Sequence, residues 1–205
     1  MSKPIVGIDI DDVVANVIDS VRLWANEKTG ASLTEDDYKT DDDYWHYYET
    51  IWERHGLIDQ VNFSMVLDDL AQDQSHIALV EGARETIHAL KQKYDLVFIT
   101  SRPAYQQDAT RRWLDERIDP EVPMYTSHNP MANADHRSKG EICAELGVEY
   151  LVDDNVGNCQ NAAQYGVEPL LFGSYGWNEQ APSSLRRFLT WEDVGEYLLN
   201  EVRQS

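Results

Sequence analysis

The stretch VGIDIDDVVAN, residues 6–16, begins as an alternating apolar run and ends with three aspartates in four positions. Side chains of a β-strand alternate between its faces, so Asp9 and Asp11 point to one side and Asp12 to the other. Two carboxylates that converge at a strand end repel each other unless one is protonated or a cation lies between them. Because hard oxygen ligands favour Mg²⁺, the pair predicts a magnesium site behind a buried strand.

Helix capping is the competing explanation for these aspartates. Asp is a favoured N-cap residue, and a role as the cap of the following helix suits Asp12 equally well. A cap uses one side chain, however, so capping does not account for Asp9 and Asp11 together.

The rest of the chain alternates strand-like and helical patterns. Apolar strand-like runs occupy residues 5–10, 96–100, 122–126, 150–152 and 169–172. Helical apolar spacing occupies residues 83–91, 105–117, 140–146, 158–165 and 191–202. This order is typical of an α/β fold, and we expect a Rossmann-like parallel sheet with helices on both faces.

The segment between the first two strands interrupts this order. From residue 16 to residue 80 the sequence is helical, aromatic and acidic, and it includes TDDDYWHYYETIWERHG, residues 40–56. Ligands of open parallel sheets bind outside the carboxyl ends of the strands, so an insertion after the first strand would cover such a site. We therefore predict a core domain of residues 1–15 and 81–205 and a helical cap of residues 16–80.

Length and charge limit the classes of function. The 205 residues suffice for one domain with an insertion. The formal charge of −20 opposes binding to nucleic-acid backbones and anionic lipids, so we expect neither polymeric nucleic acid nor a membrane as a partner. No run resembles a signal peptide or a membrane span, and we expect a cytoplasmic monomer or homodimer.

Cysteine and histidine usage does not indicate a thiolate or imidazole metal site. Cys143 and Cys159 lie in separate helical patterns without a CxxC motif, so we expect two buried free thiols. None of the six histidines forms an HExxH motif, so a histidine-based site has no support in the sequence.

Three later stretches place polar side chains at strand or helix ends. DLVFITSRP, residues 95–103, contains Thr100 and Ser101 at a helix start that suits a phosphate, although Ser-x-Pro is also an ordinary cap. Lys139 begins a helix, and because most lysines are solvated we expect it outside the core. Asp153 and Asp154 form a second acidic pair at a second strand end, which is harder to attribute to surface charge.

Taken in order, the DxD, Thr-Ser, Lys and Asp-Asp motifs resemble those of the haloacid dehalogenase (HAD) superfamily of phosphotransferases, over nearly the whole chain. Within it, the early insertion and the segments LVEGARETIHALKQKYDLVFITSRP and LLFGSYGWN are most similar to the 5'(3')-deoxyribonucleotidase group and its bacterial relatives. One departure is Asp12, because many members have glycine there, and it concerns the local backbone rather than the chemistry.

The resemblance implies the roles of the acidic residues. Asp9 corresponds to the nucleophile that forms an aspartyl-phosphate, and Asp11 to the acid and base. Mg²⁺ would be bound by Asp9, by the backbone carbonyl of Asp11 and by Asp153. Asp154 would hold a water molecule on the metal.

The resemblance also implies a phosphate site. Thr100 and the backbone at Ser101 and Arg102 would bind the phosphoryl oxygens. Lys139 would neutralise negative charge in the transition state. This local cation is what a chain of such negative charge needs to bind a phosphate ester.

The cap would select the substrate. Trp45, Tyr48 and Trp52 share one helical face, which suits either the core of the cap or stacking on a flat base. With Trp45 and Trp52 in contact with the substrate, we expect a 5'-nucleotidase acting on (deoxy)ribonucleoside monophosphates. A phosphatase acting on a sugar phosphate or another small phosphomonoester is the alternative. A non-catalytic phosphate-binding regulatory module is a further alternative, against which the intact Asp11 argues.

Overall fold

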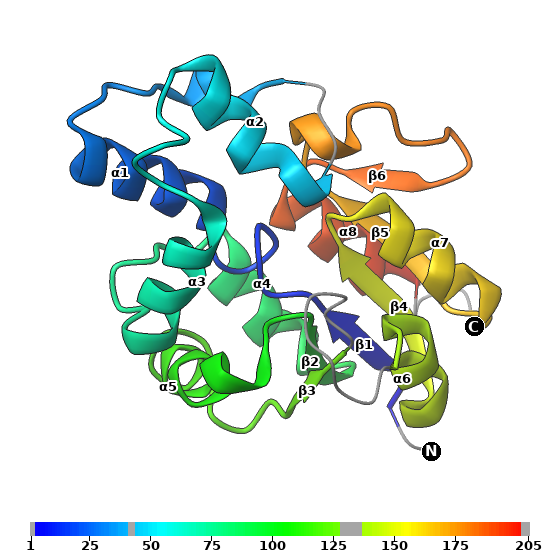
Figure 1. Cartoon of the computed structure of the whole chain (residues 1–205). Helices are drawn as coiled ribbons and strands as arrows, with labels where there is room; N and C mark the ends of the chain where they lie inside the picture. Colours follow the sequence, from blue (N-terminus) through cyan, green and yellow to red (C-terminus); the bar gives the residue numbers. More distant parts are fainter. Residues whose placement is uncertain (1–2, 41–43, 128–136, 202–205) are drawn as a thin grey trace.

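The structure, a computed structural model, describes residues 3–40, 44–127 and 137–201, without the side chains of residues 45 and 201. The described residues form one six-stranded sheet in which all neighbouring strands are parallel (Figure 1). The strands are β1 (Ile5–Ile8), β2 (Asp95–Thr100), β3 (Met124–Thr126), β4 (Val148–Asp153), β5 (Glu168–Phe172) and β6 (Arg186–Phe188). Their order in the sheet is β3-β2-β1-β4-β5-β6, which confirms the expected Rossmann-like α/β fold.

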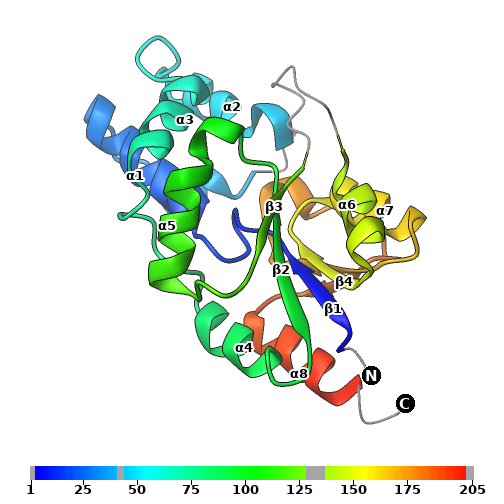
Figure 2. The ribbon, with the colours of Figure 1, turned by 90° about the horizontal axis from the view of Figure 1, so that it is seen from below.

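Helices cover both faces of the sheet, as Figure 2 shows. On one face lie α4 (Ala83–Leu90), α5 (Gln107–Arg117) and α8 (Trp191–Glu201); on the other lie α6 (Lys139–Leu146) and α7 (Val156–Gln164). Alternate residues of β2 point to opposite faces of the sheet. Phe98 packs in the apolar core on the side of α4, α5 and α8, and Ile99 packs in the core on the side of α6 and α7. Burial on both faces explains why these strands are apolar throughout.

Several element boundaries differ from the sequence pattern by one or more residues, and one strand is not predicted. β1 ends at Ile8 rather than at residue 10, so Asp9 is the first residue beyond the strand. The short edge strand β6 has no counterpart among the predicted strands, because it contains Arg186 and Arg187 instead of an apolar run. Short, charged edge strands resist pairing with other chains, and they also lack the usual strand signal.

The segment between β1 and α4 contains α1 (Val17–Thr29), α2 (Tyr47–Arg54) and α3 (Phe63–Gln72), with short 3-10 turns η1 (Glu35–Tyr38) and η2 (Tyr44–His46). These helices gather beyond the carboxyl ends of the central strands (Figure 1). The two ends of the segment run side by side, because the N–H of Val80 donates to the carbonyl of Val14 (2.8 Å). The division into a core and a cap of residues 16–80 stays a proposal.

The remaining expectations concern cysteines and membrane spans. Cys143 and Cys159 are both buried and free, as predicted. Within the described ranges, the helices all fall short of the length and apolar character that crossing a membrane requires.

Candidate active site

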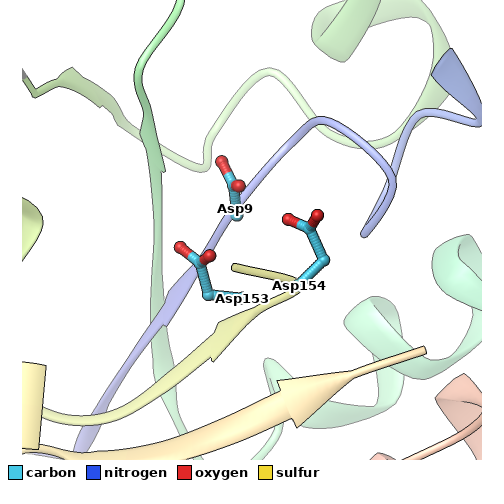
Figure 3. Close-up of side chains that lie close together, drawn as sticks. All are labelled: Asp9, Asp153 and Asp154. Carbon is cyan, nitrogen blue, oxygen red and sulfur yellow. The ribbon is translucent and has the colours of Figure 1, made fainter. Parts of the chain in front are cut away.

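Three aspartates converge at the carboxyl ends of two neighbouring strands (Figure 3). Asp9 follows β1 directly, Asp153 is the last residue of β4, and Asp154 comes next. Because β1 pairs with β4, with Ile8 opposite Val152, the sheet register brings these side chains together. All three are buried, and one carboxylate oxygen from each lies within 4.8 Å of those of the other two.

Burial and mutual repulsion oppose ionisation of this cluster. Burial raises the pKa of Asp9 to about 7; Lys139 lowers it, and the charges of Asp153 and Asp11 raise it further. Burial, and then the charges of Asp153 and Asp9, raise the pKa of Asp154 well above its usual value. A positive charge among the three carboxylates would reverse both effects.

Lys139 supplies part of that positive charge, and the expectation that it lies outside the core is wrong. Its side chain is 1% exposed, and its ammonium group lies 2.7 Å from Asp9 Oδ1 and 2.7 Å from Asp153 Oδ2. Burial alone would lower the pKa of Lys139, but the attraction of Asp153 and Asp9 outweighs burial and raises it. A lysine can be buried when two carboxylates neutralise it. The start of α6 places it, because Ser138 caps this helix through the backbone N–H of Glu141.

The three carboxylates fit a divalent cation such as Mg²⁺. Their donors are all oxygens, and three buried carboxylates beside the single ammonium group of Lys139 leave room for further positive charge. Neighbouring groups orient the ligands: the Nδ2 of Asn158 donates to Asp153 Oδ1 (3.1 Å), and the Nε1–H of Trp177 donates to Asp154 Oδ2 (2.7 Å). Such outer contacts hold metal ligands in place.

One oxygen of Asp9 is left open. Its Oδ1 accepts the ammonium of Lys139 and the backbone N–H of Ile10 (2.7 Å). Within the described part of the chain, Oδ2 has no hydrogen-bond donor. This oxygen is therefore free to bind a metal or to attack an electrophile.

Asp11 lies outside the three-carboxylate cluster and lines a neighbouring cavity. Its carboxylate is paired with Arg102, whose Nη2 lies 2.6 Å from Oδ1.

The residues expected to bind phosphate lie at the carboxyl end of β2, next to β1. The backbone N–H of Arg102, which we expected to bind phosphate, donates instead to Thr100 Oγ1 (3.1 Å). Ser101 shares a hydrogen bond with Ser127 (2.9 Å between the two hydroxyl oxygens).

Asp12 supports the start of α1 but is not its N-cap, because Asn16 occupies that position and accepts the backbone N–H of Asp19 (3.4 Å). The Asp12 carboxylate is buried and accepts the backbone N–H of Ile18 in the first turn of α1 (2.8 Å). Its φ of 56° lies in the left-handed region, which glycine adopts most readily and which Asp and Asn tolerate. The departure from glycine at this position is therefore compatible with the same backbone.

A cavity of about 320 Å³ lies beside the acidic cluster. Its polar lining includes Asp11, Ser101, Arg102, Ser127, Lys139, Asn155, Asn158 and Asn161. Its aromatic lining consists of Tyr44, Tyr47, Tyr48, Phe63 and Trp177. Tyr48 stacks on Phe63 with ring centroids 5.3 Å apart, and Tyr47 meets Trp177 edge-on at 4.8 Å. The cavity is thus lined by polar side chains, among them the ion-paired Lys139 and Arg102, and by an aromatic wall.

The two tryptophans expected to contact the substrate do not both form that wall. The side chain of Trp45 lies outside the described part of the chain, so its role stays a prediction. Trp52 is fully buried; its Nε1–H donates to the hydroxyl of Tyr38 (3.1 Å), and its ring packs near Trp24. Trp52 therefore belongs to the apolar core between α1 and α2 and is not among the residues that line the cavity. Tyr48, from the same stripe, does line the cavity.

Sequence reasoning missed two groups of this site. Trp177 comes from the loop after β5 and joins the aromatic wall to Asp154. The side chain of Arg102 binds Asp11 rather than substrate. The sequence does contain a signal for Trp177, because residues 170–178 place a tryptophan and an asparagine shortly after a strand end, where ligands bind in parallel sheets.

Comparison with known proteins bears on the fold of the chain. No family model matches the chain. A curated protein of Bacillus subtilis (strain 168) named "Putative nucleotidase YqfW" is 23% identical over 123 residues. The match covers 60% of this chain, and the chain spans only 60% of that relative.

Solved structures match over nearly the whole chain. The HAD hydrolase YfnB from Bacillus subtilis, bound to magnesium, has a TM-score of 0.60 and 13% identity, covering 97% of this chain and 100% of that one. The D,D-heptose 1,7-bisphosphate phosphatase from B. bronchiseptica, complexed with magnesium and phosphate, has a TM-score of 0.51 and 16% identity, covering 97% and 99%. The chain has a HAD-like fold. At such identities the HAD-like fold is what the likeness establishes, and the chemistry rests on the residues of the site.

Proposed function

We propose that this chain is a Mg²⁺-dependent phosphomonoester hydrolase that works through an aspartyl-phosphate. The observation that carries the proposal is the buried carboxylate of Asp9, which is paired through one oxygen with Lys139 and is open at the other. Asp11, a second carboxylate suited to proton transfer, lines the adjoining cavity. A nucleophile, a cation and an acid and base are the groups that phosphoryl transfer to a carboxylate requires.

The reaction proceeds in two displacements. Asp9 Oδ2 attacks phosphorus, and the ester P–O bond breaks as Asp11 gives its proton to the leaving alkoxide. Asp11 then takes a proton from water, whose oxygen attacks phosphorus and releases inorganic phosphate and the Asp9 carboxylate. Lys139 balances the negative charge on Asp9 and on the transferred group, and we assign phosphoryl oxygens to Thr100 and Ser101.

We assign the metal to the carboxylates of Asp9 and Asp153 and the backbone carbonyl of Asp11, with Asp154 beside them. When bound, Mg²⁺ would neutralise phosphoryl charge and help to align the ester. The chain's own residues then hold the ester. The cavity wall contacts the organic group of the ester, and Lys139 attracts its phosphoryl group.

We propose nucleoside monophosphates, deoxyribonucleotides foremost, as the substrates. The aromatic wall offers flat surfaces for a base, and each stacking contact contributes roughly 1–3 kcal/mol. A curated relative is named a nucleotidase, which supports the same substrate class. A sugar phosphate is the second candidate, supported by the polar lining and by the structural neighbour that acts on a heptose bisphosphate.

The test compares wild type with Asp9→Asn, with Mg²⁺ and with a chelator. Wild type should release phosphate only with Mg²⁺, and Asp9→Asn should lose at least about a thousandfold in kcat while keeping its circular dichroism and melting temperature. A folded Asp9→Asn protein with near-normal turnover would contradict the mechanism.

A substrate panel separates the candidates. Deoxyribonucleoside monophosphates should exceed sugar phosphates in kcat/KM by about tenfold or more. Efficient hydrolysis of sugar phosphates alone would establish the second candidate. Phosphate binding without hydrolysis of any ester would indicate a regulatory module instead.

A further inference from the structure

A buried arginine holds the Asp11 carboxylate at the cavity wall. The Nε of Arg102 lies 3.0 Å from Asp11 Oδ1 and 3.1 Å from Oδ2, and its Nη2 lies 2.6 Å from Oδ1. The side chain of Arg102 is 3% exposed, whereas that of Asp11 is 31% exposed. The pair is thus anchored in the protein on the arginine side and open to the cavity on the aspartate side.

The far side of the guanidinium is also bound. Its Nη1 donates to Gln74 Oε1 (2.5 Å) and to Thr110 Oγ1 (3.1 Å). Gln74 is held in turn, because its Nε2 donates to Thr110 Oγ1 (3.1 Å) and to the carbonyl of Leu70 (2.9 Å). Gln74 and Thr110 are both buried. A guanidinium fixed on both sides cannot swing toward a phosphate, so its function has to be exercised through Asp11.

These contacts join four separate parts of the chain. Asp11 precedes α1 and Gln74 follows α3, so the two lie at the two connections of the cap. Arg102 follows β2, and Thr110 belongs to α5 of the core. The position of the Asp11 carboxylate is therefore set by the core and by both cap connections together.

The two oxygens of Asp11 are not equivalent. Oδ1 accepts two N–H groups of Arg102, whereas Oδ2 accepts one at the longer distance. Oδ2 therefore keeps a lone pair that none of these donors occupies, and it is the oxygen available to a substrate in the cavity.

We propose that Arg102 is a positioning residue, which orients Asp11 so that Oδ2 gives its proton to the leaving oxygen of the substrate. This inference rests on the proposed function and adds to it the residue that orients the acid, Asp11. A buried ion pair contributes little net stability compared with apolar replacements, so orientation is the benefit that the geometry offers.

The leaving group distinguishes this role from a merely structural one. An alkoxide leaves only with a proton, so hydrolysis of an alkyl phosphate depends on a correctly placed Asp11. p-Nitrophenolate is a stable anion and leaves without that proton. Because kcat/KM reports the steps up to formation of the aspartyl-phosphate, it isolates the acid step.

The experiment measures kcat/KM of wild type, Arg102→Met and Arg111→Met with deoxyuridine monophosphate, glycerol 2-phosphate and p-nitrophenyl phosphate. Arg111 is a matched control, since it also pairs with an aspartate (Asp115, 2.7 Å) but does not line the cavity. Arg102→Met should lose about a hundredfold with the alkyl ester that wild type prefers and less than about threefold with p-nitrophenyl phosphate. Arg111→Met should match wild type with all three esters.

A second variant guards against a folding defect. Arg102→Lys keeps the charge but lacks the planar fork, so it should show the same leaving-group-dependent loss at about tenfold. Equal losses with alkyl and aryl esters in the folded variants, or no loss with either, would overturn the role of Arg102 while the phosphatase proposal stands. A wild-type protein that hydrolyses none of the three esters would overturn both.

Discussion

At the scale of single residues, Asp12 shows that an acidic side chain beside the three-carboxylate cluster can serve the fold. Its carboxylate accepts the N–H of Ile18, and its φ is positive, which among described residues is otherwise seen only at glycines. Burial raises the pKa of Asp12 to about 8, with Asp11 and Asp9 adding to the increase. The folded protein therefore favours the neutral acid at this position.

This protonation makes stability depend on pH. Between about pH 4 and pH 8 the folded protein keeps a proton on Asp12 that the unfolded chain has lost, so this group lowers the free energy of unfolding as the pH rises. Asp12→Asn cannot ionise, tolerates the left-handed backbone and keeps an acceptor for Ile18. Urea unfolding with a chelator should show Asp12→Asn more stable than wild type by at least about 1 kcal/mol at pH 8, with the difference vanishing near pH 4.

Asp12→Ala is the control for the hydrogen bond. It removes the charge and also the acceptor, and it places alanine at positive φ, so it should be less stable than Asp12→Asn by about 1 kcal/mol or more at every pH. A constant difference between wild type and Asp12→Asn from pH 4 to pH 8 would show that Asp12 is ionised in the folded state.

At the scale of elements, Thr40 and Tyr47 lie close to the loop that follows β5. A Cβ on Gly176, in the 3-10 turn η4 (Gly176–Asn178), would lie 1.8 Å from the carbonyl oxygen of Thr40 and 2.5 Å from the hydroxyl of Tyr47. Both partners belong to the proposed cap, and Tyr47 lines the cavity together with Trp177. Glycine is required here by the close approach of two backbones.

Gly176→Ala should force these segments apart. We expect a loss of about 1–3 kcal/mol in the free energy of unfolding and a higher KM for the preferred substrate, because the aromatic wall is displaced. Gly195→Ala, within α8, is the matched control; its nearest neighbour would be a methyl group of Thr86 at 3.0 Å, and its effect should stay within about 1 kcal/mol. Indistinguishable melting curves and KM values for the two variants would refute the close contact.

At the scale of the whole molecule, the charge of −20 has to be tolerated by the folded state. Asp outnumbers Glu and Arg outnumbers Lys, a bias compatible with a surface adapted to high salt, although an ordinary acidic protein is an equally good description. Self-repulsion of exposed carboxylates is screened as the ionic strength rises.

The salt-adapted description predicts a melting temperature that rises steadily from low to molar potassium chloride. Sucrose of equal osmolality is the control, because it favours compact states without screening charge. An unchanged or falling melting temperature in potassium chloride would exclude salt adaptation.

The sequence alone determined the α/β class and, through its resemblance to the HAD superfamily, which acidic residues to expect together. The strand pattern by itself paired Asp9 with Asp11, whereas the structure joins Asp9 to Asp153 and Asp154, because the carboxyl ends of the parallel strands β1 and β4 meet at one edge of the sheet. The order of strands and helices could also be predicted from the sequence. The exception is β6, because its arginines do not form an apolar strand pattern.

Only the tertiary structure decided which polar and aromatic side chains join that cluster. Helical spacing puts Tyr48 and Trp52 on one face of a helix. It does not predict that Trp52 is buried away from the cavity whereas Tyr48 lines it. From the sequence, Lys139 is expected at the surface. In the structure it is buried because Asp9 and Asp153 bind its ammonium group. The pairing of Arg102 with Asp11 spans 91 positions and leaves no local pattern, because the partner of a buried charge is chosen by the packing of distant segments.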